Sequence, residues 1–381
     1  MIYLDNSATT RVLPEAADAA CRAMTEQYYN PASAYQPAVA AEKAVEAARA
    51  RLAAALGCAA GEVLYTSGGT ESNNMAVFGS IRPLRGKRRV VTAKGEHPSI
   101  YEVFRSLEGA AETEVAFAGL NADGTVRLDE LEEALTPDTA LVSVMHVNNE
   151  VGAVNDLAVI ASLIKKCAPV ALFHSDGVQA FCKLPFSRIP ADLYSVSAHK
   201  FHAPKGVGAL FVRNGVKFSG GQFGGGQERN LRSGTLNVPG ILGFDAALAL
   251  YRANQAEWIE QMRANKLRLW NNLRQIPDAV VNGPAPEDGA PHILNVSFPG
   301  VRGEVLVNAL SERGICVSTG SACSTHQKGQ NRILSAMGIS GARAEGALRF
   351  SLCPFNTAEE MDAAANALVS QVAFLRRFQR R

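Results

Sequence analysis

The sequence lacks the features that would place it in several specialised classes of protein. Its 38 Lys and Arg residues nearly balance its 36 Asp and Glu residues, so a net charge of +2 gives no electrostatic reason to expect a nucleic-acid or membrane partner. No apolar run approaches membrane-spanning length, and no secretory signal precedes Met1. These absences lead us to expect a cytoplasmic protein.

Cysteine is scarce as well, with seven residues in 381 and no C-x-x-C pair among them. That spacing argues against a structural zinc site and a disulfide framework, and it favours a reducing compartment. The chain also contains neither a P-loop nor a G-x-G-x-x-G fingerprint of nucleotide-binding proteins. We therefore predict no metal, and we look for function in single residues near the ends of predicted strands.

The chain has an ordinary globular composition, 47% hydrophobic and 19% charged, and is long enough for one large and one smaller domain. Helical segments such as 128–135 and 157–166 alternate with short apolar segments that we predict to be strands, at 63–66, 89–93, 113–118, 140–147, 170–176, 192–197 and 207–212. Such alternation is typical of a parallel sheet covered by helices on both faces. After Asn282, a mixture of predicted strands and helices indicates an α+β domain.

Two of the predicted strands end beside residues that can carry chemistry. Ala171–Asp176 ends in a carboxylate, and Asp192–Ser197 leads directly to Lys200. In open α/β sheets, ligands bind at the carboxyl ends of the strands. A lysine and an aspartate there suit pyridoxal phosphate, which needs an amine for its Schiff base and an acid to keep the pyridine nitrogen protonated. A buried Lys–Asp ion pair without a ligand explains the spacing equally well.

Another candidate is Ser67-Gly-Gly-Thr70, which leads from a predicted strand into a predicted helix. The glycines expose backbone N–H groups, and the hydroxyls and the helix N-terminus favour an anion such as a phosphate. A plain helix cap is an equally good interpretation of this motif.

Four further residues have side chains suited to catalysis or binding. His97 follows a strand end and could stack on an aromatic ring or move protons near neutral pH, although a lone histidine is more often structural. Asn149 and Gln179 could hydrogen-bond a cofactor oxygen or simply cap turns. Cys323 lies among small and hydroxylated residues, which suits an accessible nucleophilic thiol, whereas most free cysteines are packed as small hydrophobes.

Together, these residues lie in motifs that resemble those of the cysteine desulfurases, in the class V aminotransferase group of fold-type I pyridoxal phosphate enzymes. The resemblance covers the chain essentially end to end, and its specificity comes from the order and spacing of many short motifs. They include Leu4-Asp-Asn-Ser-Ala-Thr-Thr, Thr66-Ser-Gly-Gly-Thr-Glu-Ser-Asn-Asn, Met145-His-Val-Asn-Asn-Glu-Val-Gly, His174-Ser-Asp-Gly-Val-Gln, Ser197-Ala-His-Lys, Gly224-Gly-Gly-Gln-Glu-Arg, Arg232-Ser-Gly-Thr-Leu and Gly320-Ser-Ala-Cys.

The resemblance implies an α/β fold, that of a fold-type I pyridoxal phosphate-dependent transferase. Its large domain, residues 15–255, would bind the cofactor on a mostly parallel seven-stranded sheet covered by helices. A smaller α+β domain, residues 1–14 and 256–381, would carry the loop of the catalytic cysteine.

The resemblance also implies how the cofactor is held. Lys200 would form the Schiff base, Asp176 would face the pyridine nitrogen, and His97 would stack on the ring. The positions that hold the phosphate match Gly69, Thr70, Ser197 and His199.

Further positions would serve the substrate and a second subunit. Asn149 and Gln179 match amides at the cofactor and substrate, and Arg349 matches the arginine that pairs with the substrate carboxylate. The fork of an arginine fits a carboxylate through two parallel hydrogen bonds. Thr235 would reach the cofactor of the partner subunit in a homodimer.

By the same resemblance, the reaction would remove sulfur from L-cysteine, giving L-alanine and a persulfide on Cys323. An acceptor protein, such as an iron–sulfur scaffold or a thiolation enzyme, would then take the sulfur. A selenocysteine lyase or another class V pyridoxal enzyme is the alternative function. A scaffold without turnover is disfavoured because the lysine, aspartate, histidine, arginine and cysteine are all retained. His326 and Lys328, in the same loop as Cys323, have no assigned role.

Overall fold

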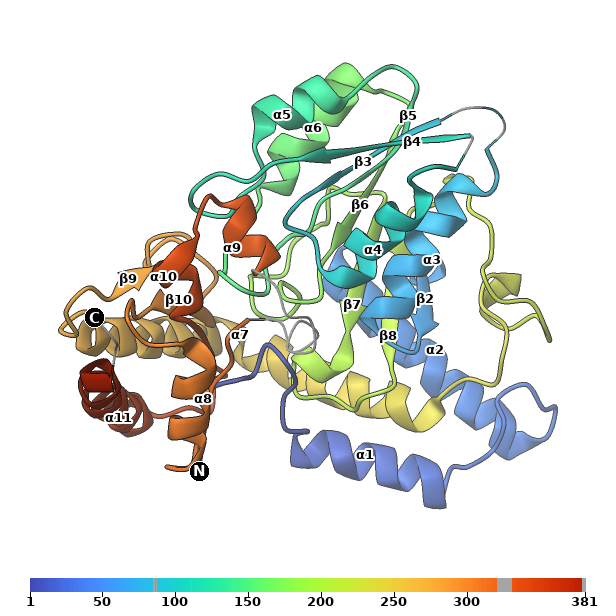
Figure 1. Cartoon of the computed structure of the whole chain (residues 1–381). Coiled ribbons are helices and arrows are strands. Elements are labelled where there is room, and N and C mark those ends of the chain that lie inside the picture. The colour runs from blue at the N-terminus through green and yellow to red at the C-terminus, as the bar shows by residue number, and fades with distance from the viewer. Residues whose placement is uncertain (85, 87, 111, 321–330, 379–381) are drawn as a thin grey trace.

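The computed structural model describes residues 1–84, 86, 88–110, 112–320 and 331–378. A seven-stranded sheet lies at its centre, in the strand order β2-β8-β7-β6-β5-β3-β4 (Figure 1). The strands from β4 to β7 run parallel, whereas β8 is antiparallel to both of its neighbours. The predicted, mostly parallel seven-stranded sheet is therefore confirmed. Its strands are Val63–Thr66 (β2), Arg88–Ala93 (β3), Thr113–Ala118 (β4), Thr139–Ser143 (β5), Leu172–Asp176 (β6), Leu193–Ser197 (β7) and Gly208–Val212 (β8).

Helices cover both faces of this sheet because successive side chains along a strand point to opposite faces. On one face, side chains such as Leu64 and Val90 pack under the helices Gly69–Ile81 (α3) and Pro98–Leu107 (α4). On the other face, Tyr65 and Val91 belong to the largest core of the protein. The helices that contribute to that core are Pro14–Thr25 (α1), Gln36–Leu56 (α2), Leu128–Ala134 (α5), Leu157–Cys167 (α6) and Val238–Leu273 (α7).

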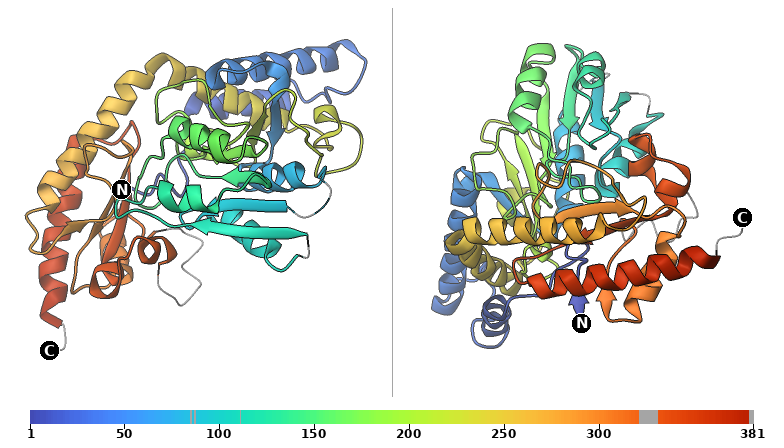
Figure 2. Two further views of the ribbon diagram at one scale, coloured as in Figure 1. Left: turned by 90° about the horizontal axis from the view of Figure 1, so that it is seen from above. Right: turned by 90° about the vertical axis from the view of Figure 1, so that its left-hand side faces the viewer.

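A second core lies at the far end of α7, a helix of 36 residues that runs from the central sheet into it (Figure 2). Its strands are Ile2–Tyr3 (β1), Val280–Val281 (β9), Ile293–Ser297 (β10), Ile315–Cys316 (β11) and Ala347–Ser351 (β12), and its helices include Gly303–Ser311 (α8) and Ala358–Leu375 (α11). The N-terminal strand β1 pairs in parallel with β11, so the first residues of the chain lie beside residues from its last quarter. The predicted domain limits, 15–255 and 1–14 with 256–381, stay a prediction.

Short helices complete this second region, at Arg332–Ala336 (α9) and Gly341–Glu345 (α10). Within the residues that the structure describes, no helix combines the length and the apolar character needed to cross a bilayer.

The end of β5 differs from the prediction of a strand over 140–147. The assigned strand ends at Ser143, and Met145 then takes its hydrogen bonds from side chains instead of a neighbouring strand. Its N–H donates to Glu96 Oε1 at 2.7 Å, and its carbonyl accepts from Asn155 Nδ2 at 2.8 Å. Buried polar side chains therefore replace strand pairing on one side of the chain, whereas the Val144 and His146 N–H groups still donate to the His174 and Asp176 carbonyls of β6, at 3.1 and 2.9 Å. An apolar pattern does not reveal this one-sided change.

A buried ion pair fixes α2 against the edge strand β2. Arg49 donates to both carboxylate oxygens of Glu228, at 2.8 and 2.7 Å, and Glu228 Oε2 also accepts from the Tyr65 backbone N–H at 2.7 Å. Glu228, Arg229 and Asn230 all have positive φ angles, of 47°, 59° and 63°. Non-glycine residues rarely adopt that conformation, so the ion pair holds a strained turn in place.

We predict that Arg49→Met lowers the free energy of unfolding by about 3 kcal/mol, because it leaves the buried Glu228 carboxylate without its cation. Arg51→Met is the matched control. Arg51 lies on the same helix and makes a similar two-bond pair with Asp245, but its side chain is 49% exposed. An exposed pair is expected to contribute less than about 1 kcal/mol. Denaturant titration of both variants measures the difference, and equal losses would contradict the assignment.

Candidate active site

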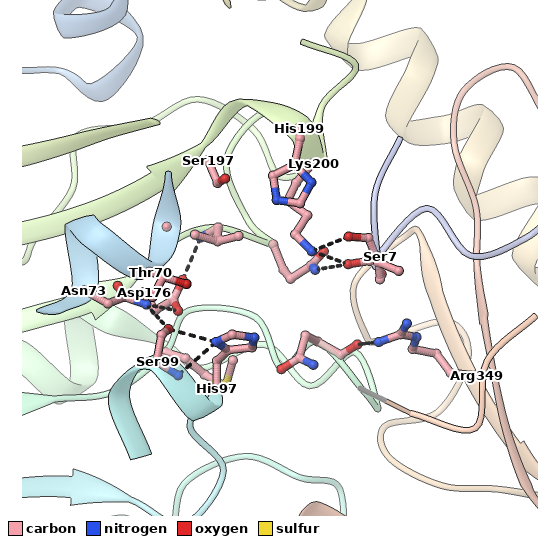
Figure 3. Close-up of a pocket in the computed structure, with 16 residues that line it drawn as sticks. Ser7, Thr70, Asn73, His97, Ser99, Asp176, Ser197, His199, Lys200 and Arg349 are labelled. Atoms are coloured by element: carbon pink, nitrogen blue, oxygen red, sulfur yellow. Dashed lines mark hydrogen bonds between the residues drawn. The ribbon is translucent and has the colours of Figure 1, made fainter. Parts of the chain in front are cut away.

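A cavity of about 250 Å³ opens at the carboxyl edge of the central sheet, where β6 and β7 end (Figure 3). β6 ends at Asp176, and β7 leads into a short helical turn, Ala198–Lys200. The residues that line the cavity include Ser7, Ala8, Gly69, Thr70, Asn73, His97, Ser99, Met145, Asn149, Asp176, Val178, Gln179, Ser197, His199, Lys200 and Arg349. Every residue predicted for the site is among them except Thr235 and Cys323.

The Lys200 amine is held by the N-terminal segment of the chain. Its Nζ donates to the carbonyl oxygens of Ser7 and Ala8, at 2.7 and 2.8 Å. The same segment is tied to the lysine turn through Thr10, whose N–H donates to the His199 carbonyl at 3.0 Å. The lysine thus reaches the cavity with its amine directed by backbone carbonyls that sequence analysis did not assign to the site.

Asp176 has different partners from Lys200. It is 4% exposed, and its two oxygens accept from Asn73 Nδ2 at 2.7 Å and from the Val178 N–H at 2.9 Å. These two donors orient the carboxylate at the cavity wall. The alternative in which Asp176 and Lys200 serve only to neutralise each other is disfavoured, because each side chain is directed by other groups.

His97 is held in one tautomer by a short hydrogen-bond network. Its Nδ1 accepts from the Ser99 N–H at 3.2 Å and lies 2.8 Å from Ser99 Oγ, which itself accepts from Asn73 Nδ2 at 2.8 Å. Because Nδ1 is an acceptor, the proton of the neutral ring lies on Nε2. Burial lowers the pKa of His97, against the opposing effect of the Asp176 charge. The ring is therefore neutral at physiological pH.

Gly69 and Thr70 at the N-terminus of α3, with Ser197 beside them, form a cradle of backbone and hydroxyl donors at the cavity. Gly68, with a φ of 149°, precedes the helix and has no side chain to cap its first N–H groups. A Cβ at Gly69 would lie only 2.8 Å from Val178 Cγ2, so the backbone approaches the cavity wall closely. Ser197 Oγ is buried and has no hydrogen-bond partner among the described residues. Free donors at a helix N-terminus suit a phosphate.

His199 belongs to the same wall of the cavity. Burial and the nearby Lys200 and Lys205 charges lower its pKa to about 3, so its imidazole is neutral. Its Nδ1 lies 3.2 Å from Thr9 Oγ1. With the cradle, Asp176 and Lys200 at one cavity, the residues fit pyridoxal phosphate, which presents a phosphate, a ring nitrogen and an aldehyde.

Arg349, on β12, closes the opposite side of the cavity. It is 1% exposed, and its two Nη atoms donate to the Asn149 carbonyl at 2.9 Å and to Asp5 Oδ1 at 2.7 Å. Its Nε has no hydrogen-bond partner among the described residues. Arg349 lines the cavity, and a buried guanidinium with an unused donor suits a carboxylate ligand.

Two predicted site residues are not placed at this cavity. Thr235 lies exposed just before α7, outside the lining, and its predicted role at a partner subunit stays a prediction. Cys323, with His326 and Lys328, lies outside the residues that the structure describes. In the part of the chain that is described, no group of three or more His, Cys, Asp or Glu side chains could hold a metal ion.

Several residues that shape the cavity were not predicted from the sequence. Ser7 and Asp5 belong to the quoted N-terminal motif, but its polar, turn-like pattern did not indicate a contact with Lys200 or Arg349. Asn73 lies in the quoted motif that begins at Thr66. Its position one turn into the predicted helix could have indicated that its side chain lies near the cavity. Ser99 follows His97 by two residues, a spacing that permits the side chain of His97 to cap the helix.

Comparison with known proteins identifies the family. The chain matches the class-V aminotransferase family over residues 2–364, and it belongs to that family. The family resemblance and the fold class predicted from the sequence are confirmed.

Particular relatives are similar over nearly their whole length. The cysteine desulfurase of Trichormus azollae is 39% identical over 383 residues, which cover 99% of this chain and 94% of the relative. A solved structure of a NifS-like protein has a TM-score of 0.92 at 37% identity, covering 98% of this chain and 99% of that one. Another, SspA in complex with cysteine, has a TM-score of 0.80 at 29% identity, covering 94% of this chain and 100% of that one.

A buried histidine beneath the site should make the apoprotein sensitive to acid. His174 links β5 and β7, with its ring nitrogens 2.8 Å from Ser143 Oγ and 3.0 Å from Ser195 Oγ, and burial lowers its pKa to about 3. Between that value and about 6.5, the unfolded chain binds a proton that the folded protein does not. Stability must therefore fall as the pH falls through this window.

We predict that His174 alone costs the apoprotein about 2 kcal/mol of unfolding free energy between pH 6.5 and pH 5. His174→Gln removes this titration, so its stability should decline less steeply over that interval, whatever its stability at neutral pH. Chemical denaturation of both proteins at a series of pH values measures the two slopes. Parallel slopes would show that His174 takes up its proton in the folded state.

Proposed function

We propose that this protein is a cysteine desulfurase that uses pyridoxal phosphate to remove sulfur from L-cysteine. The observation that carries this proposal is the convergence of Lys200, Asp176, His97 and Arg349 on one cavity, next to a cradle for a phosphate. Its support is the 39% identity to a cysteine desulfurase along nearly the whole chain. The products are L-alanine and a persulfide on Cys323. This reaction balances without an added oxidant, because one sulfur atom moves from the substrate to the thiol.

The residues of the cavity would hold the cofactor at three points. Lys200 would bind its aldehyde, Asp176 would hydrogen-bond its pyridine nitrogen, and the phosphate would lie at Gly69, Thr70, Ser197 and His199. The cofactor, when bound, withdraws electrons from the substrate, which acidifies the α-proton and weakens the Cβ–S bond. His97, neutral and with its proton on Nε2, would lie against the ring, and Gln179 would hydrogen-bond a ring oxygen.

The substrate would be oriented by Arg349 and Asn149. Arg349 would take the carboxylate of L-cysteine, using the Nε donor that has no partner among the described residues and exchanging its contact with Asp5. The Lys200 amine, freed from the cofactor by the amino group of the substrate, would remove the α-proton. The Ser7 and Ala8 carbonyls accept hydrogen bonds from this amine and hold it within the cavity.

Cys323 would collect the sulfur. Its thiolate would attack the sulfur atom of the substrate, breaking the Cβ–S bond and forming a new S–S bond. An acceptor protein, such as an iron–sulfur scaffold or a thiolation enzyme, would receive the sulfur from the persulfide. A homodimer in which the exposed Thr235 reaches the cofactor of the partner subunit also belongs to this proposal, as does a cytoplasmic location.

The test of the proposal is the fate of the sulfur in a Cys323→Ser variant. This variant should bind pyridoxal phosphate and show a spectral change on adding L-cysteine, because the cofactor residues are intact. It should lose at least 99% of alanine and sulfide release, because no thiol receives the sulfur. Mass spectrometry should find one extra sulfur atom on the wild-type protein and none on the variant.

Cys21→Ser is the control, since Cys21 is an exposed cysteine on α1 that does not line the cavity. It should keep wild-type activity. If Cys323→Ser turned over L-cysteine at the wild-type rate, the thiol would not be the sulfur acceptor. Turnover of L-selenocysteine in place of L-cysteine would favour the lyase alternative.

Arg349→Lys should raise KM for L-cysteine about tenfold or more, because an ammonium cannot reproduce the two-bond fork of a guanidinium. The visible absorption of the bound cofactor should persist. Arg343→Lys is the matched control, because Arg343 bonds Asn282 and the Val281 carbonyl, away from the cavity. Steady-state kinetics of the two variants compare the sites, and an unchanged KM in Arg349→Lys would place the carboxylate elsewhere.

A further inference from the structure

A second lysine lies directly behind the cavity. Lys183 is 2% exposed, and its Nζ donates to Gln179 Oε1 at 3.2 Å. The turn after β6 brings the two side chains together, because the Phe181 N–H bonds the Gly177 carbonyl and the Lys183 N–H bonds the Ala180 carbonyl. Lys183 is not among the described residues that line the cavity, so it acts on a ligand only through Gln179.

This contact determines which end of the Gln179 amide faces the cavity. An ammonium carries only donors, so the atom that it contacts must be the amide oxygen. His292 Nε2 lies 3.4 Å from the same oxygen, which agrees with that orientation. The amide nitrogen therefore points the other way and donates to the Ser7 carbonyl at 3.0 Å, the carbonyl that also accepts from Lys200.

The surroundings of Lys183 make it a costly residue to bury. Burial lowers its pKa to about 7, and the nearby Lys200 charge acts in the same direction. A buried ammonium that is bonded to a neutral amide lacks the compensation of a direct ion pair. The titratable and charged groups that interact with it are Lys200, Arg349, His199, His202, His292, Cys182 and Cys353. An apolar side chain of the same length would fill this position at lower cost.

We propose that Lys183 is a positioning residue, which fixes the Gln179 amide with its nitrogen toward the cavity and so selects a ligand with an acceptor oxygen at that point. The inference rests on the proposed function, in which the ligand is pyridoxal phosphate and the acceptor is an oxygen of its ring. Without Lys183, the amide keeps only the Ser7 carbonyl and the longer His292 contact to hold this orientation. The rotated amide, which presents its own oxygen and repels the ring oxygen, is then populated more often.

A double-mutant cycle on the apoprotein tests this role, with the dissociation constant of pyridoxal phosphate from equilibrium dialysis as the readout. Lys183→Met keeps the length of the side chain and removes its donors. It should weaken binding about tenfold when Gln179 is present, and less than about twofold in a Gln179→Ala background. Equal losses in the two backgrounds would overturn the proposal, as would no loss in either.

Inorganic phosphate, as a second probe, separates positioning from a general effect on the fold. It occupies only the cradle at α3, so Lys183→Met should change its affinity by less than about twofold. If Lys183→Met weakens the binding of phosphate and of pyridoxal phosphate to the same extent, Lys183 contributes to stability or overall charge and the proposal fails.

Lys266→Met is the matched control. Lys266 is a buried lysine on α7 whose Nζ donates to the Ala290 carbonyl, not to Gln179, and burial lowers its pKa to about 8. This variant should leave both dissociation constants unchanged. A wild-type protein that binds pyridoxal phosphate but does not desulfurate L-cysteine would contradict the proposed function and leave the role of Lys183 supported. A wild-type protein that takes up no pyridoxal phosphate would overturn both.

Discussion

The site depends on one backbone carbonyl, that of Ser7. It accepts hydrogen bonds from Lys200 Nζ at 2.7 Å and from Gln179 Nε2 at 3.0 Å, so it sets the positions of two cavity residues on different turns. Its own position is fixed on both sides, since Asp5 binds Arg349 and the Asn6 N–H bonds the Ser351 carbonyl. The segment from Asp5 to Ser7 thus connects the central sheet to the second core. The cavity lies between these two parts of the molecule.

The central sheet supplies the other half of this geometry. Because β6 and β7 are parallel neighbours, Asp176 and Lys200 arrive at the same edge. His174, buried between Ser143 and Ser195, links the strands that carry them. The parallel strands place Asp176 and Lys200, and the charged groups at the cavity are directed by backbone groups, amide side chains and the Asp5 carboxylate.

Much of this could be predicted from the sequence, for identifiable physical reasons. The strands are short apolar runs, and such runs can be recognised in the sequence alone. Both faces of the sheet are covered, so successive side chains such as Leu64 and Tyr65 are apolar although they point to opposite faces. Asp176 and Lys200 could be found because each stands next to the end of a strand. His97, Asn149 and Gln179 were candidates by residue type alone, and only the family resemblance gave them roles. Ser197, His199 and Arg349 came from the resemblance alone.

Other parts could not be predicted, because they depend on contacts between distant segments. Nothing near Ser7 or Asp5 in the sequence indicates that they meet Lys200 and Arg349. Beyond the end of β5, Glu96 and Asn155 take the hydrogen bonds of Met145 while its neighbours still bond β6, which an apolar pattern does not record. Lys183 follows Gln179 by four residues, a helical spacing, but the sequence does not show that this segment after β6 forms helix-like turns. Their contact could therefore not be predicted.

The pairing of the first residues with the last quarter of the chain has a consequence for how the protein is made. β1 needs β11, and Ser351 bonds the backbone of both Leu4 and Asn6. β1 therefore finds its partners only after the chain has been synthesised as far as β11 and Ser351, and contacts of such long sequence separation form slowly. The central sheet can assemble earlier, but its lysine would wait for the carbonyls that direct it. The cavity would thus be the last part of the molecule to be completed, after both of the cores that it joins.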